Sequence, residues 1–109
     1  MKVLIVMGQV IEDTGTRYRC TANLYDIMRR FKYLGELYVC AIKYNGSNSH
    51  TKIEKDLQDV VKYGNISFIG KDYIFMSATN KNIVRKSMQR VDLVISYGAS
   101  YDVYQYATP

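Results

Sequence analysis

Two glycine-containing loops are the segments of this sequence best suited to bind a small ligand. They occupy residues 8–19 and 98–101, and each lies between an apolar run and a predicted helix. Free backbone N–H groups and the helix dipole favour an anion at such a place, and glycine lets the backbone approach a ligand closely. An ordinary polar turn is the alternative interpretation of the first loop. The candidate substrate-binding residues are Gly8, Gly15, Thr16, Arg17, Gly98, Ala99 and Ser100.

Common catalytic and nucleotide-binding motifs do not occur in the chain. Gly8 and Gly15 are too far apart for the Gly-x-Gly-x-x-Gly dinucleotide motif, and no Gly-Lys-Ser/Thr sequence occurs. The run Thr14–Thr16 is similar to a flavodoxin phosphate loop but lies further from its strand. No Gly-x-Ser-x-Gly occurs, and His50 has no Ser or Asp at triad positions. We therefore name no catalytic residue from the sequence, and a small flavin- or nucleotide-binding protein is a weaker alternative.

The cysteines and the histidine do not suggest a metal site. The chain has two widely spaced cysteines, Cys20 and Cys40, and a single histidine, His50. Without a Cys-x-x-Cys pair, we expect no zinc site made of several Cys and His ligands. Small secreted scaffolds carry more cysteines than this. We expect two buried thiols and a cytoplasmic location.

The charge balance permits an anionic partner without requiring one. There are 15 Lys and Arg against 10 Asp and Glu, which gives a net charge of +5. Such a balance is compatible with phosphate, acidic lipid or nucleic acid, but we expect no nucleic-acid partner. Arg29, Arg30 and Lys32 lie in the last turn of a predicted helix, where cations also favour the helix dipole. A solvated helix end and an anionic contact are both open interpretations.

Strands and helices alternate along the chain. Apolar runs predict strands over residues 2–7, 36–43, 66–69 and 92–97. Helices are predicted over residues 21–33 and 53–61, from 79–80 to about 88, and from 101 onward. Thr21 is the expected N-cap of the first helix, Gly35 its stop, and Thr79 or Asn80 the N-cap of the third.

This alternation predicts an α/β fold with a parallel sheet and right-handed crossovers. We expect one Rossmann-like, doubly wound domain over residues 1–109, with three α/β/α layers and strand order 3-2-1-4. Both glycine loops would lie at the carboxyl edge of such a sheet, where ligands bind. The unfinished helix after Tyr101 suggests a piece of a longer protein. No run is long enough to span a bilayer, and no signal peptide is recognisable.

Tyrosine is unusually frequent, with 11 in 109 residues, and four lie near the end at 97, 101, 104 and 106. Tyrosine suits sugars, bases and protein partners, because it combines an apolar ring with a polar tip. Packing beneath a further part of the chain is the alternative interpretation.

Three stretches resemble the N-terminal half of glycosyltransferases of the GT-B type, which have two Rossmann-like domains. They resemble in particular bacterial enzymes that use nucleotide-sugars during surface-polysaccharide assembly. The stretches are Met1–Val6, the helix and strand of Leu24–Phe31 and Gly35–Val39, and Arg90–Ser96. The first loop departs from the family's Gly-Gly pair, since only Gly15 matches. In the family, two glutamates seven residues apart meet the donor in the C-terminal half, and no such pair occurs here.

The resemblance implies the N-terminal, acceptor-side domain of a glycosyltransferase that moves a sugar from a nucleotide-sugar to a saccharide or lipid-linked acceptor. Gly15, Thr16 and Arg17 would face the donor phosphate or the acceptor, and residues 98–100 would shape the acceptor pocket. The full-length enzyme would need a nucleotide-sugar donor and no tightly bound cofactor. Its partner would be a C-terminal domain of the same chain, so this domain alone is expected to bind acceptor weakly without catalysis.

Lipid-linked acceptors would also suit peripheral contact with the inner face of the membrane. Arg17, Arg19, Arg29 and Arg30 are the basic residues that would meet anionic lipid there. The alternative from another class is a non-catalytic α/β binding or interaction module.

Overall fold

A computed structural model of the chain describes residues 1–13, 15, 18–44, 55–56, 65–72, 74 and 77–97. The loop at 98–101, the helix expected after Tyr101 and most of the helix expected over residues 53–61 lie outside these residues. The candidate site residues Thr16, Arg17, Gly98, Ala99 and Ser100 also lie outside them.

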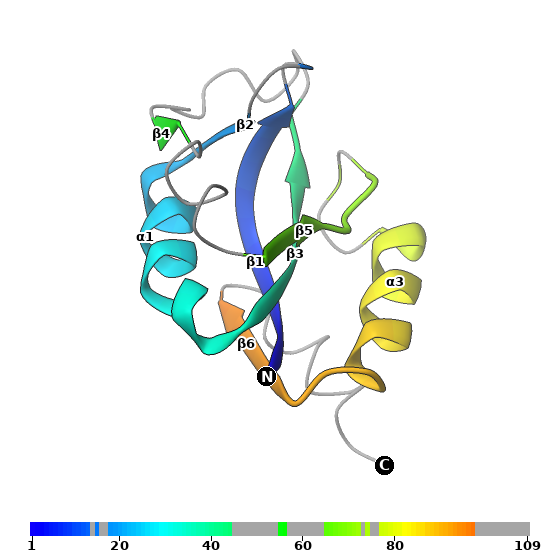
Figure 1. Ribbon diagram of the computed structural model, residues 1–109. Coiled ribbons are helices and arrows are strands. Elements are labelled where there is room, and N and C mark those ends of the chain that lie inside the picture. The colour runs from blue at the N-terminus through cyan, green and yellow to red at the C-terminus, as the bar shows by residue number, and fades with distance from the viewer. Residues whose placement is uncertain are drawn as a thin grey trace.

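A mostly parallel, curled sheet forms the centre of the molecule (Figure 1). Its middle strand, β1 (Lys2–Asp13), pairs in parallel with β3 (Glu36–Lys43) along one edge. Along the other edge, β1 pairs in parallel with β6 (Leu93–Tyr97). The strand β5 (Asn65–Phe68) continues the parallel ladder beyond β3.

Two short antiparallel strands extend the sheet beyond the expected four. The far half of β1 turns back into β2 (Tyr18–Cys20), which in turn pairs with β4 (Lys55–Asp56). The sheet order is β4-β2-β1-β3-β5, with β6 also paired to β1, so it differs in detail from the all-parallel order that we expected. Residues 55–56, expected within a helix, form the strand β4 instead.

The helices α1 (Ala22–Phe31) and α3 (Ala78–Met88) lie on opposite faces of the sheet (Figure 1). Side chains alternate between the faces, as in any β-strand. Val3 and Ile5 join the core beneath α1, whereas Leu4 and Val6 join the smaller core around Val84 of α3. Burial of β1 on both faces explains its unbroken apolar run.

The helix ends show how neighbouring residues fix their limits. Thr21 is at the N-cap position of α1, as expected, but its side chain makes no capping hydrogen bond. A short 3-10 helix, η1 (Lys32–Leu34), follows α1 and ends at Gly35, whose φ of 141° favours glycine. Ser77, rather than Thr79 or Asn80, caps α3, because its Oγ accepts a hydrogen bond from the Asn80 N–H at 3.2 Å.

Candidate functional site

The carboxyl ends of β1 and β6 lie side by side, at the point where the crossover connections change from one side of β1 to the other. After β1 the chain passes through α1 on one face to β3, whereas α3 on the other face leads to β6 on the opposite edge of β1. Open α/β sheets bind ligands at such a switch point. The last paired residues there are Met7 of β1 and Tyr97 of β6.

A β-bulge in β1 lies at this switch point. Val6 pairs with Cys40 and Val10 with Ile42, so β1 advances four residues where β3 advances two. The irregular residues are Met7, Gly8 and Gln9, of which Gly8 and Gln9 are half-buried. Bulges are frequent beside active sites, because they redirect side chains and interrupt strand pairing.

We expected Gly8 at the start of a loop, but it lies inside the strand β1. The reason is that the apolar residues Val10 and Ile11 continue β1 past the bulge, and both are buried. Gly8 nevertheless lies at the carboxyl edge of the parallel strands, next to the end of β6.

Gly15 lies in a different place from Gly8. It belongs to the turn between β1 and β2, has a φ of 89°, and donates its N–H to Asp13 Oδ1 at 2.8 Å. This turn precedes a strand and not a helix, so the expected helix-dipole anion site does not form at Gly15. Asp13 is six residues beyond Met7, or about 20 Å along an extended strand. The structure thus separates Gly8 and Gly15.

The start of α1, rather than Gly15, lies beside the bulge. The Thr21 N–H donates to the Val10 carbonyl oxygen at 3.2 Å, immediately after the irregular residues. Thr21 is 6% exposed, and its Oγ1 is buried with no hydrogen-bond partner in the described part of the chain. The first turn of α1 contains no acidic residue.

Ser96 of β6 carries a second hydroxyl of this kind. It pairs with Val6, the residue that precedes the bulge, and its Oγ is also buried without a partner in the described ranges. Buried polar atoms are normally satisfied, so each exception needs an explanation. These two hydroxyls belong to residues on either side of the bulge, and residue spacing does not reveal them because burial without a partner has no sequence signal.

The cysteines are buried thiols, as expected, and they do not supply a nucleophile. Burial raises the pKa of Cys20 to about 12 and that of Cys40 to about 11. Both therefore remain protonated near neutral pH, and the thiolate is the reactive form. The Cys20 thiol also donates to the Thr21 carbonyl oxygen at 3.2 Å.

Among the described residues, no group of three or more His, Cys, Asp or Glu side chains could hold a metal ion. Within the same ranges, no helix has the length and apolar character needed to cross a membrane.

The C-terminal end of α1, which carries the basic residues, lies near the amino ends of the parallel strands, whereas the bulge lies toward their carboxyl ends (Figure 1). Arg29 and Arg30 are exposed, and with Asp26, Lys32 and Tyr33 they line an open hollow. Lys32 Nζ lies 5.0 Å from the centre of the Tyr33 ring, and Tyr33 is 79% exposed. An exposed aromatic ring thus lies beside a cation at this helix end.

The fold and the site define a mixed α/β domain with a candidate ligand site at the switch point of its sheet. Comparison with known proteins adds no relative, since no protein-family model, no curated protein and no solved structure matches the chain.

Proposed function

We propose that this chain is the N-terminal, acceptor-side domain of a GT-B type glycosyltransferase that uses a nucleotide-sugar. In this proposal the parallel strands form a Rossmann-like half-domain, and the acceptor binds at the carboxyl edge between β1 and β6. The observation that carries the proposal is the bulge at Met7–Gln9, which lies at the switch point between two buried hydroxyls that have no partner among the described residues. The resemblance of three stretches to the family supplies the substrate class.

The residues around the bulge have chemistry suited to a saccharide. A sugar hydroxyl both donates and accepts hydrogen bonds, and the Gln9 amide can do the same. Gly8 has no side chain, and glycine lets the backbone approach a ligand closely.

The donor would bind mainly to a second domain of the same chain, and closure of the two domains would complete the site. Residues 98–100, which follow β6 directly, would shape the acceptor pocket. Thr16 and Arg17, which lie outside the described residues, would face the donor phosphate or the acceptor. Because the donor would bind mainly to that second domain, this domain alone would bind acceptor weakly and not transfer sugar. No described residue is assigned as catalytic base.

Amide NMR of the 109-residue chain tests this proposal. Saccharides and UDP-glucose would be titrated singly, and we expect a saccharide to shift the amides of Met7–Gln9, Thr21 and Ser96. Gln9→Ala should weaken these shifts, whereas Thr79→Ala on the exposed side of α3 should not. Saccharide shifts confined to other surfaces, or no shifts, would contradict the proposal. Binding at the bulge by ligands other than sugars or nucleotide-sugars would favour the non-catalytic module.

We also propose that the end of α1 makes the peripheral membrane contact of such an enzyme. Arg29, Arg30 and Tyr33 are exposed together there. Clustered basic residues attract anionic lipid, and tyrosine suits the membrane interface, where one end of its ring is apolar and the other hydrated.

A further inference from the structure

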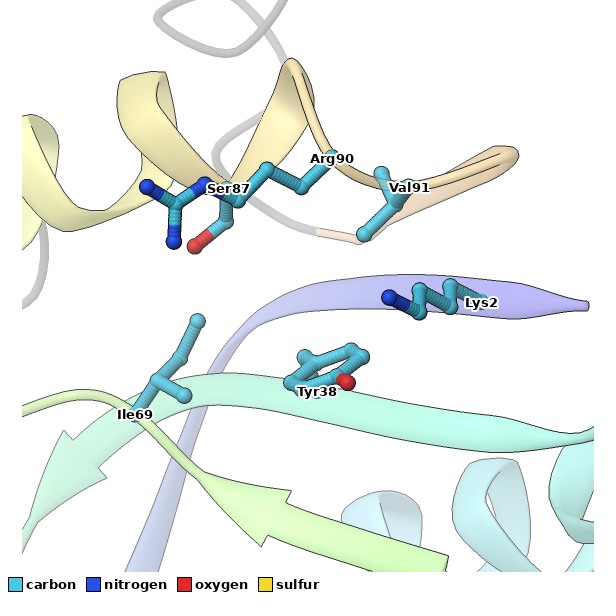
Figure 2. Close-up of a pocket in the computed structure, with 6 residues that line it drawn as sticks. All are labelled: Lys2, Tyr38, Ile69, Ser87, Arg90 and Val91. Carbon is cyan, nitrogen blue, oxygen red and sulfur yellow. The ribbon is translucent and has the colours of Figure 1, made fainter.

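A cavity lies between the C-terminal end of α3 and the sheet, away from the bulge (Figure 2). Its volume is about 290 Å³, which suits a small ligand. Its floor is formed by side chains of β1 and β3 and by the residue that follows β5, and its roof by the end of α3. The lining residues are Lys2, Tyr38, Ile69, Ser87, Arg90 and Val91.

Two cations, Lys2 and Arg90, lie at this cavity. Figure 2 shows the side chains of Lys2 and Arg90 on opposite sides of the open space. Neither side chain forms an ion pair with any carboxylate in the described part of the chain. Two unpaired cations across a small space favour a ligand with several anionic oxygens, and the planar guanidinium suits phosphate in particular.

The nearby carboxylates are already hydrogen-bonded to other groups. Asp92 Oδ2 accepts the backbone N–H of Lys2 at 2.8 Å, and Glu36 Oε2 accepts the Tyr38 hydroxyl at 2.6 Å. The hydrogen bond to Glu36 raises the pKa of the Tyr38 hydroxyl, which therefore stays neutral and fixed in place. These bonds fix the orientation of the two acidic side chains, which line the neighbouring hollow together with Lys2 and Arg90.

The remaining walls suit a flat, apolar body. Tyr38, Ile69 and Val91 are half-buried and pack against the core beneath α3. The hydrogen bond at the Tyr38 hydroxyl holds one end of its ring, whereas the rest of the ring faces the cavity (Figure 2). Ser87 places a hydroxyl on the roof, where it could donate to an anionic oxygen.

We propose that this cavity is a binding site for a small phosphorylated compound with a flat ring. Lys2 and Arg90 hold the phosphate, Ser87 donates to it, and the ring lies between Tyr38 and the aliphatic side chains. The site is separate from the bulge, because Lys2 and Met7 stand about 16 Å apart along β1. It does not depend on the proposed glycosyltransferase function.

Calorimetry with phenyl phosphate tests the proposal on the 109-residue chain. Inorganic phosphate is the probe for the anionic half of the ligand, and phenol is the probe for its ring. We expect phenyl phosphate to bind at least about tenfold more tightly than either, since the cavity offers partners to both halves. Binding should weaken with added salt, because exposed cations are screened.

The variant Lys2→Gln/Arg90→Gln should lose at least about tenfold in affinity, because hydrogen bonds to charged groups are the strong ones. The matched control Lys71→Gln/Lys86→Gln removes the same charge from two exposed positions that do not line the cavity and should retain affinity within about twofold. Circular dichroism would verify that both variants fold, as expected for exposed positions.

Amide NMR locates the binding. Phenyl phosphate should shift the amides of Tyr38, Ile69 and Ser87 and leave Gly8 and Gln9 unchanged. The proposal is overturned by an absence of binding, by equal loss in the control variant, or by shifts confined to another surface. Equal affinity for phenyl and inorganic phosphate would overturn the flat-ring specificity.

Discussion

Gly70 and Gly15 resist substitution for different physical reasons. A Cβ at Gly70 would lie 2.7 Å from the Ala41 carbonyl oxygen. A Cβ at Gly15 would meet nothing within 4 Å, but the backbone there has a φ of 89°, which residues with a side chain rarely adopt. We expect Gly70→Ala to lower the free energy of unfolding by about 1–3 kcal/mol through overpacking. Gly15→Ala should cost about 1 kcal/mol through backbone strain alone. Urea unfolding measures both, and a neutral Gly70→Ala would show that β3 and residue 70 can separate.

Asn80 holds the segment after β5 against the start of α3. It is fully buried; its Oδ1 accepts the Lys71 N–H at 2.9 Å, and its Nδ2 donates to the Ile74 carbonyl oxygen at 3.3 Å. Asn80→Ala would leave both backbone groups without these partners and should cost about 1–3 kcal/mol in the free energy of unfolding. Thr79→Ala, at an exposed neighbour, is the control. Equal stability of the two variants would show that water replaces Asn80 freely.

The buried thiols should make the fold less stable in alkali. Cys20 and Cys40 have a pKa of about 12 and 11 when folded, against an ordinary value of 9.0. Above pH 9 the unfolded chain releases these protons whereas the folded chain keeps them, so the free energy of unfolding falls as pH rises. Between pH 8 and 10 the two thiols together should account for about 2–3 kcal/mol of this fall.

Comparison with Cys20→Ala/Cys40→Ala isolates this effect, because other ionising groups are common to both proteins. Urea unfolding at each pH should show a shallower decline in the variant. Identical pH dependence would mean that the thiols ionise as easily in the folded chain as in the unfolded one.

At the scale of an element, the last turn of α1 should bind anionic lipid. Arg29→Glu/Arg30→Glu should lower the affinity for phosphatidylglycerol vesicles, measured by co-sedimentation, by at least about tenfold. The reason is that each basic residue near a charged membrane contributes about 1 kcal/mol to binding. Lys71→Glu/Lys86→Glu makes the same charge change at exposed positions on the other face. Unchanged vesicle binding by the α1 variant, or equal loss in both, would exclude this helix end as the membrane contact.

Long elements with an uninterrupted pattern could be predicted from the sequence. The strand Glu36–Lys43 was predicted with its observed bounds, and α1 was predicted from the apolar stripe that includes Leu24 and Met28. The far half of β1 was missed, because Gly8 was interpreted as the end of the strand. The strand β2 is three residues long, and β4 is two. Strands so short have no measurable periodicity, and only pairing with a neighbour forms them.

For the whole molecule, alternation of strand and helix predicted the α/β class and the helices on both faces. The candidate site was predicted only in part. Gly8 lies at the switch point but within a bulge, and Gly15 lies in a distant hairpin turn. A bulge depends on the register between two strands, and whether a buried hydroxyl finds a partner depends on the packing around it. Neither Thr21 nor Ser96 could therefore be identified from residue spacing.

The most direct test of the proposed two-domain glycosyltransferase is the reading frame that follows the codon for Pro109 in the gene. We expect it to continue into a second α/β domain that carries two glutamates seven residues apart, the pair that would meet the nucleotide-sugar. A stop codon directly after Pro109, or a continuing sequence with no such domain, would contradict the proposal and leave a small α/β binding module.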